Sequence, residues 1–128
     1  MKCESVELVL PFKAEYVSIA RLTASGVASR VGFDIDTIED IKVSISEVCN
    51  KLVSTGSQSA ENYRIVFKVS DTALNVTFQC EDHSLKSVFD QNGDELGISI
   101  ITALMDDIEF CGCGSNLLSM SKKLEGNI

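Results

Sequence analysis

Four polar residues recur along one predicted helix at a spacing that gathers them on a single face. Asp40, Ser44, Glu47 and Lys51 follow one another at intervals of four, three and four residues. An α-helix places such residues side by side, here opposite its apolar stripe. A carboxylate and an ammonium group one turn apart form an ion pair, and an exposed pair contributes little to stability. From the residues alone this ion pair is the favoured interpretation, and a chemical role for Glu47 needs a further argument.

The cysteines, five in number, are a second group that could carry chemistry. The stretch Cys111-Gly-Cys113-Gly is the pair that could bind a metal or act in redox chemistry, and His83 is the one further soft ligand in the sequence. The CxxC spacing typical of zinc sites is absent, so a glycine-rich turn between strands is favoured. Cys49 and Cys80 lie in apolar segments and are expected in the core.

Length and composition predict one domain that spans residues 1–128. Of the 128 residues 45% are hydrophobic, which is enough to fill a single core. The net charge of −8 would repel a nucleic-acid backbone, so direct nucleic-acid binding is not expected. The apolar runs are too short for a membrane span or a signal peptide. Free thiols in a reducing cytoplasm are therefore the expectation.

Hydrophobic periodicity predicts the elements that would position these residues. The helix from Glu15 to Val31 ends at Gly32, a residue type that favours helix C-termini. The predicted apolar stripe of this helix consists of Tyr16, Ile19, Ala20, Thr23 and Val27. The next helix is predicted to begin with a variant capping box at 36–39, Asp-Thr-Ile-Glu. Its predicted apolar stripe consists of Ile38, Ile41, Ile45, Val48, Cys49 and Leu52.

The remaining segments complete the predicted order of elements. Alternating apolar and polar residues predict five strands, at 5–12, 63–69, 74–80, 107–111 and 116–122. A third helix is predicted from Leu96 to Met105, and residues 81–93 are predicted to be irregular. This order predicts an α+β fold, a two-layer α/β sandwich whose mixed, mostly antiparallel sheet carries the helices on one face.

The segment from Glu15 to Val53 carries a resemblance to a known family. Its sequence EYVSIARLTASGVASRVGFDIDTIEDIKVSISEVCNKLV resembles the anti-sigma-factor serine kinases of the RsbW and SpoIIAB type. These proteins belong to the GHKL superfamily of histidine-kinase-like ATP-binding domains. The resemblance implies an ATP site with Mg²⁺ on the polar face of the second helix. There Glu47 would be the general base of phosphoryl transfer.

The residues around this implied site depart from the family pattern. The position four residues after Glu47 is normally an Asn that binds Mg²⁺, and here it is Lys51, whose ammonium group cannot replace an oxygen ligand. Asn50 is the alternative magnesium ligand, through a shift of one residue in register. An adenine-binding Asp-x-Gly turn is expected after the strand that ends near Cys80, where Glu81 and Asp82 stand without a glycine.

The third implied nucleotide element is a glycine-rich turn before the last helix, where backbone N–H groups would meet the phosphates. Gly93 and Gly97 survive there, and the sequence from Leu96, LGxxIxxxLMDD, is similar to the family. The carboxylates of Asp94 and Glu95 would repel a triphosphate. The segment available for an ATP lid, 84–92, is shorter than in the family.

The resemblance also implies protein partners. Family members form homodimers and contact a sigma factor or an anti-anti-sigma antagonist through the first helix. Arg21 stands at the position of a partner-binding arginine, and its spacing predicts an outward ridge formed by Ser18, Arg21, Ser25 and Ser29. We therefore expect an anti-sigma-factor-like regulator with weak or lost ATP binding. An active ATP-dependent protein-serine kinase is the alternative, and a scaffold subunit that has lost both activities is a third interpretation.

Overall fold

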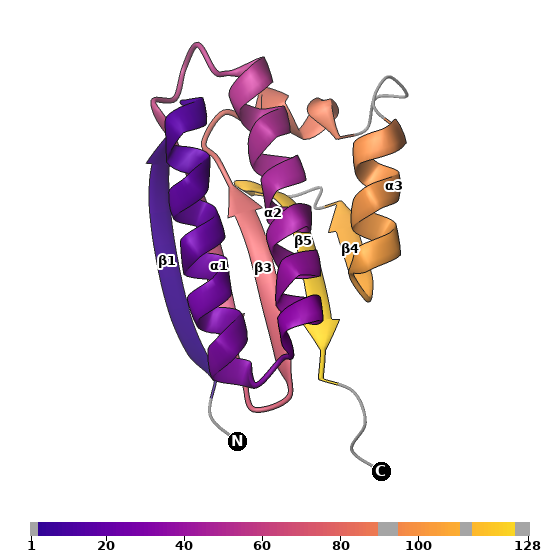
Figure 1. The fold of residues 1–128 in the computed structure, drawn as a ribbon. Coiled ribbons are helices and arrows are strands. Elements are labelled where there is room, and N and C mark those ends of the chain that lie inside the picture. Colours follow the sequence, from indigo (N-terminus) through magenta and orange to yellow (C-terminus); the bar gives the residue numbers. More distant parts are fainter. Residues whose placement is uncertain (1–2, 90–94, 111–113, 125–128) are drawn as a thin grey trace.

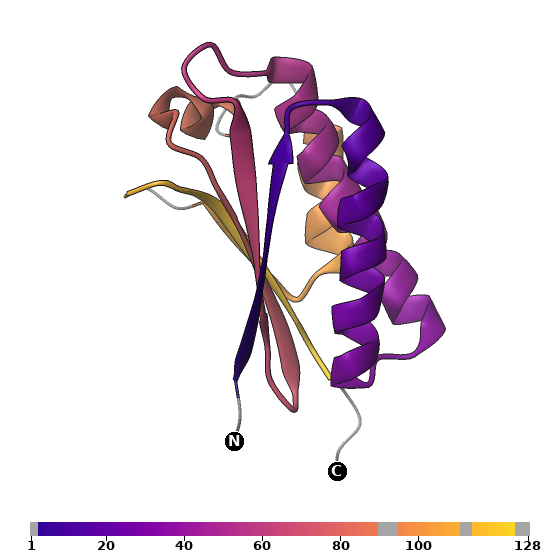
Figure 2. The ribbon, with the colours of Figure 1, turned by 90° about the vertical axis from the view of Figure 1, so that its left-hand side faces the viewer.

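A five-stranded antiparallel sheet carries three helices on one of its faces in the computed structural model, which describes residues 3–89, 95–110 and 114–124 (Figure 1). The edge-on view in Figure 2 shows α1 and α2 on the same side of the sheet. The strands are β1 (Glu4–Pro11), β2 (Asn62–Val69), β3 (Ala73–Gln79), β4 (Asp107–Phe110) and β5 (Asn116–Lys123). The helices are α1 (Val17–Val31), α2 (Ile35–Thr55) and α3 (Glu95–Leu104), with 3₁₀ turns η1 (Ala14–Tyr16) and η2 (His83–Val88).

The sheet has the order β1-β2-β3-β5-β4, and all four pairings between its described strands are antiparallel. The predicted α+β sandwich is confirmed, although the sheet described here has no parallel pair. Its inner face is apolar because Ile65, Phe67, Leu74, Val76 and Phe78 alternate toward the helices. No helix among the described residues has the length and apolar character that a membrane crossing needs.

Helix α2 is the central helix of the layer, and its apolar stripe lies on the sheet. Most of the predicted stripe is confirmed, because the following side chains are fully buried: Ile41, Ile45, Val48, Cys49 and Leu52. Its predicted start at Asp36 was wrong. Asp34 is the N-cap, and its carboxylate accepts a hydrogen bond of 2.8 Å from the backbone N–H of Thr37, so the helix begins at Ile35. That hydrogen bond lowers the pKa of Asp34.

Helix α1 is rotated relative to the predicted stripe. Its buried residues are Val17, Ala20, Ala24, Val27, Ala28 and Val31, whereas Ile19 is 39% exposed and Thr23 is half-buried. Ala20, Ala24 and Ala28 are each 0% exposed because α1 packs against both α2 and the sheet. The helix ends as predicted at Gly32, which has a φ of 107°, a left-handed conformation that glycine adopts readily.

The burial of the α2 stripe can be tested at Ile45. We expect Ile45→Ala to lower the free energy of unfolding by about 2–5 kcal/mol, because it leaves a cavity in a close-packed core. Ile35→Ala removes the same atoms from the first residue of the same helix, where the side chain is 78% exposed. Urea unfolding should therefore leave Ile35→Ala close to wild type. Equal losses in the two variants would contradict the placement of α2.

Candidate functional site

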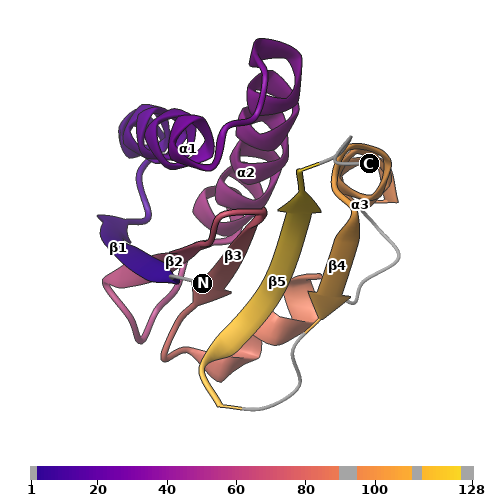
Figure 3. The same ribbon diagram turned by 90° about the horizontal axis from the view of Figure 1, so that it is seen from below.

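The four polar residues on α2 lie on the flank of the helix that faces away from α1. Ser46 on the opposite flank contacts α1 through Arg21, and α3 packs against α2 on the side away from α1 (Figure 3). Ser44 is 0% exposed and donates a hydrogen bond of 3.0 Å to the backbone carbonyl of Asp40. The expectation of an open polar face was therefore wrong for Ser44, since it placed all four residues opposite the apolar stripe.

Glu47 and Lys51 are half-buried on this flank of α2, and Asn50 is exposed. The Glu47 side chain forms no hydrogen bond or ion pair with any residue that the structure describes. Asn50 is turned about 100° around the helix from Lys51, because an α-helix has 3.6 residues per turn. The Asn50 and Lys51 side chains therefore leave α2 in different directions, and Asn50 does not take the place of Lys51.

These residues do not fit the Mg²⁺ that the family implies. Magnesium requires oxygen ligands in an octahedral arrangement. Glu47 supplies one carboxylate, whereas Lys51 supplies an ammonium group in the position of the expected oxygen ligand. Within the described ranges no group of three His, Cys, Asp or Glu side chains could hold a metal ion. The ion pair predicted between Glu47 and Lys51 is also not formed, and Glu47 is left as a single carboxylate without a side-chain partner among the described residues.

Asp82 is held in a hydrogen-bond network that joins two loops, which we call the Asp82 network. One carboxylate oxygen accepts 2.6 Å from the Ser57 hydroxyl, and the other accepts 2.6 Å from the Ser84 hydroxyl and 3.1 Å from its N–H. The Ser57 hydroxyl oxygen also accepts hydrogen bonds from the backbone N–H groups of Ser59 and Ala60. The loop after α2 and the turn after β3 are thereby tied together.

The Asp82 network favours the ionised form of the carboxylate and engages both of its oxygens in hydrogen bonds. The hydrogen bond from Ser57, followed by that from Ser84, lowers the pKa of Asp82 below its ordinary range. Three hydrogen bonds from Ser57 and Ser84 already use most of the acceptor sites of this carboxylate, which leaves little capacity for an adenine amino group. Glu81 beside it is exposed, and Cys80 is buried with its thiol 3.7 Å from the carbonyl oxygen of Asn62.

The segment that follows β3 is more regular than predicted. Residues 83–88 form η2, which packs against α2 and β5. Leu85 and Phe89, four residues apart, are 2% and 7% exposed and join the hydrophobic core. Their i, i+4 spacing is a sequence signal that could have located this packed turn. An apolar segment therefore lies beside α2, where the sequence predicted only an irregular loop.

The third implied nucleotide element lies partly outside the described residues. Gly93 and Asp94 fall there, and so do the side chains of Glu95 and Leu96, although both residues belong to α3. Gly97 is buried in the first turn of α3. Cys111 and Cys113 also lie outside the described residues, whereas burial raises the pKa of the Cys49 thiol to about 11.

The predicted outward ridge on α1 is only partly outward. Ser18 and Ser29 are exposed, while Arg21 and Ser25 are half-buried. The Arg21 guanidinium Nη1 donates a hydrogen bond of 2.8 Å to the Ser46 hydroxyl on α2. Arg21 therefore lies in the groove between the two helices. The exposed crest of α1 carries Leu22, which is 71% exposed.

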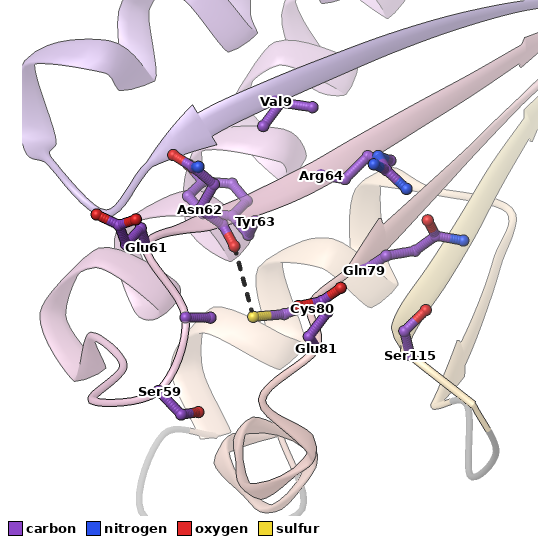
Figure 4. Close-up of a pocket in the computed structure, with 11 residues that line it drawn as sticks. Val9, Ser59, Glu61, Asn62, Tyr63, Arg64, Gln79, Cys80, Glu81 and Ser115 are labelled. Atoms are coloured by element: carbon purple, nitrogen blue, oxygen red, sulfur yellow. Dashed lines mark hydrogen bonds between the residues drawn. The ribbon is translucent and has the colours of Figure 1, made fainter.

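A cavity that sequence reasoning did not identify opens at the end of the sheet where β2 begins and β3 ends (Figure 4). Its volume is about 430 Å³, and Val9, Arg64 and Gln79 contribute to it from the face without helices. Its lining is polar, but Arg64 is already 3.6 Å from Glu7, with which it forms an ion pair. None of the residues that line the cavity belongs to α2, so it is separate from the flank that carries Glu47.

The arrangement of a five-stranded sheet with α2 at the centre of one helical layer defines the class of protein. A family model described as a histidine kinase-like ATPase domain matches residues 10–122, so the chain belongs to the histidine kinase-like ATPase family. The sequence-based assignment to the GHKL superfamily is confirmed.

Curated relatives narrow this class to the RsbW type. Serine-protein kinase RsbW of Bacillus cereus (strain B4264) is 34% identical over 140 residues, which cover 95% of this chain and 86% of that protein. Serine-protein kinase RsbW of Halalkalibacterium halodurans is 28% identical over 137 residues, which cover 95% of this chain and 85% of that protein. The resemblance to RsbW-type serine kinases is therefore confirmed over nearly the whole chain.

The Asp82 network predicts a local effect on backbone protection. We expect Asp82→Ala to speed hydrogen exchange at the Ser59, Ala60 and Ser84 amides. The Ser84 N–H donates directly to the Asp82 carboxylate. The Ser59 and Ala60 N–H groups donate to the Ser57 hydroxyl, which the same carboxylate holds in place. Glu81→Ala, which removes the neighbouring exposed carboxylate, is the matched control and should leave these amides unchanged.

The same network has a defined pH dependence. Because the pKa of Asp82 is lowered in the folded state, its contribution to stability is present above the unfolded-state pKa and is lost as the pH falls through the folded-state pKa. We expect the protection of these three amides, measured relative to their intrinsic exchange rates at each pH, to fall in that acidic window. Unchanged protection in Asp82→Ala would show that the two loops are joined by other contacts.

Proposed function

We propose that this protein is an anti-sigma-factor-like regulator that binds a sigma factor or an anti-anti-sigma antagonist and binds Mg-ATP weakly or not at all. Membership of the histidine kinase-like ATPase family and similarity to RsbW support the regulatory role. The observation that carries the loss of nucleotide binding is the Asp82 network, in which both carboxylate oxygens are occupied by serines. Homodimerisation belongs to the same proposal.

Three further observations support weak nucleotide binding. Lys51 brings a positive charge where Mg²⁺ would need an oxygen ligand. Ser44 is completely buried on the flank of α2 that the family uses for nucleotide. Leu85 and Phe89 fill space beside α2 with apolar side chains, and neither side chain offers a hydrogen bond to a phosphate or a base.

One observation favours the alternative, an active protein-serine kinase. Glu47 is half-buried and has no hydrogen-bond or ion-pair partner among the described residues, so its carboxylate is available to accept a proton. In that function Glu47 would take the proton of a serine hydroxyl on the antagonist. The affinity for Mg-ATP separates the two functions.

Nucleotide affinity tests the proposal directly. We expect isothermal titration with Mg-ATP to give a millimolar or weaker Kd, because the described residues offer no cluster of carboxylates for the metal and Asp82 is already engaged. Low-micromolar binding, or phosphorylation of a captured antagonist that Glu47→Gln abolishes, would contradict the proposal and establish the kinase.

Lys51→Asn is the informative companion variant in the same titration. It restores the residue type that the family uses at the metal position, so we expect Mg²⁺-dependent affinity to rise if the missing ligand is the main defect. The Asp82 network limits this gain. Unchanged affinity in Lys51→Asn would assign the defect to the turn after β3 and not to α2.

Partner capture tests the regulatory role. We expect wild-type protein to retain a sigma factor or an antagonist from extract of its host cells, identified by mass spectrometry. Arg21→Glu should weaken this binding by about 2 kcal/mol or more, because a partner carboxylate would lose a paired guanidinium and meet a like charge. Arg30→Glu makes the same charge change at an exposed position of α1, beside Glu4, and should have a smaller effect. Equal retention of the same partner by wild type and Arg21→Glu would remove the groove beside α1 as the binding surface.

A further inference from the structure

The contact between Arg21 and Ser46 has a fixed direction. The Ser46 hydroxyl donates a hydrogen bond of 2.9 Å to the backbone carbonyl of Lys42 and accepts one of 2.8 Å from Arg21 Nη1. A serine hydroxyl has a single hydrogen and accepts through its lone pairs, so the bond to Lys42 leaves the oxygen oriented toward Arg21. Ser46 is only 7% exposed, and its side chain is therefore held in place by α2.

This contact uses one edge of the guanidinium group and leaves the remaining donors available. Arginine carries five N–H donors in a planar fork, and Ser46 occupies one nitrogen. Arg21 has no carboxylate within ion-pair distance among the described residues. The guanidinium is thus oriented but not neutralised, which is the arrangement that a bidentate carboxylate ligand requires. Orienting it before binding lowers the conformational entropy lost when a partner docks.

We infer that Ser46 is a positioning residue for partner binding: it holds the Arg21 guanidinium in the groove between α1 and α2, in the orientation in which a partner carboxylate is bound. This inference rests on the proposed function, because it adds Ser46 of α2 to the partner-binding surface that the proposed function places on α1. It places the recognition surface in the groove between α1 and α2 and not on the exposed crest of α1.

The inference also links two flanks of α2. Ser46 and Glu47 are consecutive residues, about 100° apart around the helix. Ser46 faces Arg21 on α1, and Glu47 lies toward the flank where α3 packs. The packing of α2 therefore fixes the position of Glu47 and the contact with Arg21 together.

A double-mutant cycle tests the inference. The ligand is the purified sigma factor or antagonist that the wild-type protein captures, and the Kd is measured by titration for wild type, Ser46→Ala, Arg21→Ala and the double variant. We expect Ser46→Ala to weaken binding roughly tenfold, as for loss of a hydrogen bond to a charged group. In the Arg21→Ala background, Ser46→Ala should have no further effect, because the group it positions is absent.

Two control variants separate positioning from general destabilisation. Ser44→Ala removes a second buried hydroxyl of α2 that bonds to the carbonyl four residues earlier but does not contact Arg21. It should leave the Kd unchanged. Ser46→Thr keeps the hydroxyl and should restore binding to near the wild-type level. Thermal unfolding of each variant shows that the proteins compared are folded.

The possible outcomes distinguish this inference from the proposed function. If Arg21→Ala weakens binding and Ser46→Ala does not, the positioning role of Ser46 is wrong while the proposed function stands. If Ser46→Ala weakens binding equally with and without Arg21, Ser46 acts through α2 alone, which also overturns the inference. If wild type captures neither a sigma factor nor an antagonist, the proposed function is wrong and the inference falls with it.

Discussion

The burial of one apolar stripe of α2 on the sheet fixes the geometry of everything around it. Ile41, Ile45, Val48 and Leu52 are completely buried, so the helix has a single rotational setting. That setting sends Ser46 toward α1 and the flank with Glu47 toward α3. The N-cap at Asp34 fixes where the helix begins, and so its position along its axis. Partner contacts and any chemistry at Glu47 therefore depend on the same packing.

Much of the fold could be predicted from the sequence because it follows from local periodicity. The α2 stripe, the end of α1 at Gly32 and the alternation in the strands are all local signals, and they predicted the elements to within a few residues. The predicted start of α2 was wrong because Asp34 and Asp36 are both of a residue type that favours the N-cap position. The stripe of α1 was misplaced because α2 covers part of its surface, so small alanines are buried and Ile19 is not.

The candidate site was harder to predict because its contacts join residues far apart in the chain. Ser57 and Asp82 are 25 residues apart, as are Arg21 and Ser46. Family motifs could indicate which positions to examine, such as Asp82 and Lys51, but not that serines occupy the carboxylate of Asp82. Within the described residues, the chain itself satisfies the carboxylate of Asp82 and the hydroxyl of Ser44.

The buried alanines of α1 restrict how this sequence can diverge. Ala20, Ala24 and Ala28 have no exposed surface, and α1 packs directly against α2. A larger side chain at any of these positions would wedge the helices apart and stretch the 2.8 Å contact between Arg21 and Ser46. Substitutions at these alanines would therefore be selected against for their effect on partner binding as well as for their effect on stability. A homologue that has lost its partner should be recognisable by bulkier residues at these three positions, even where its arginine is retained.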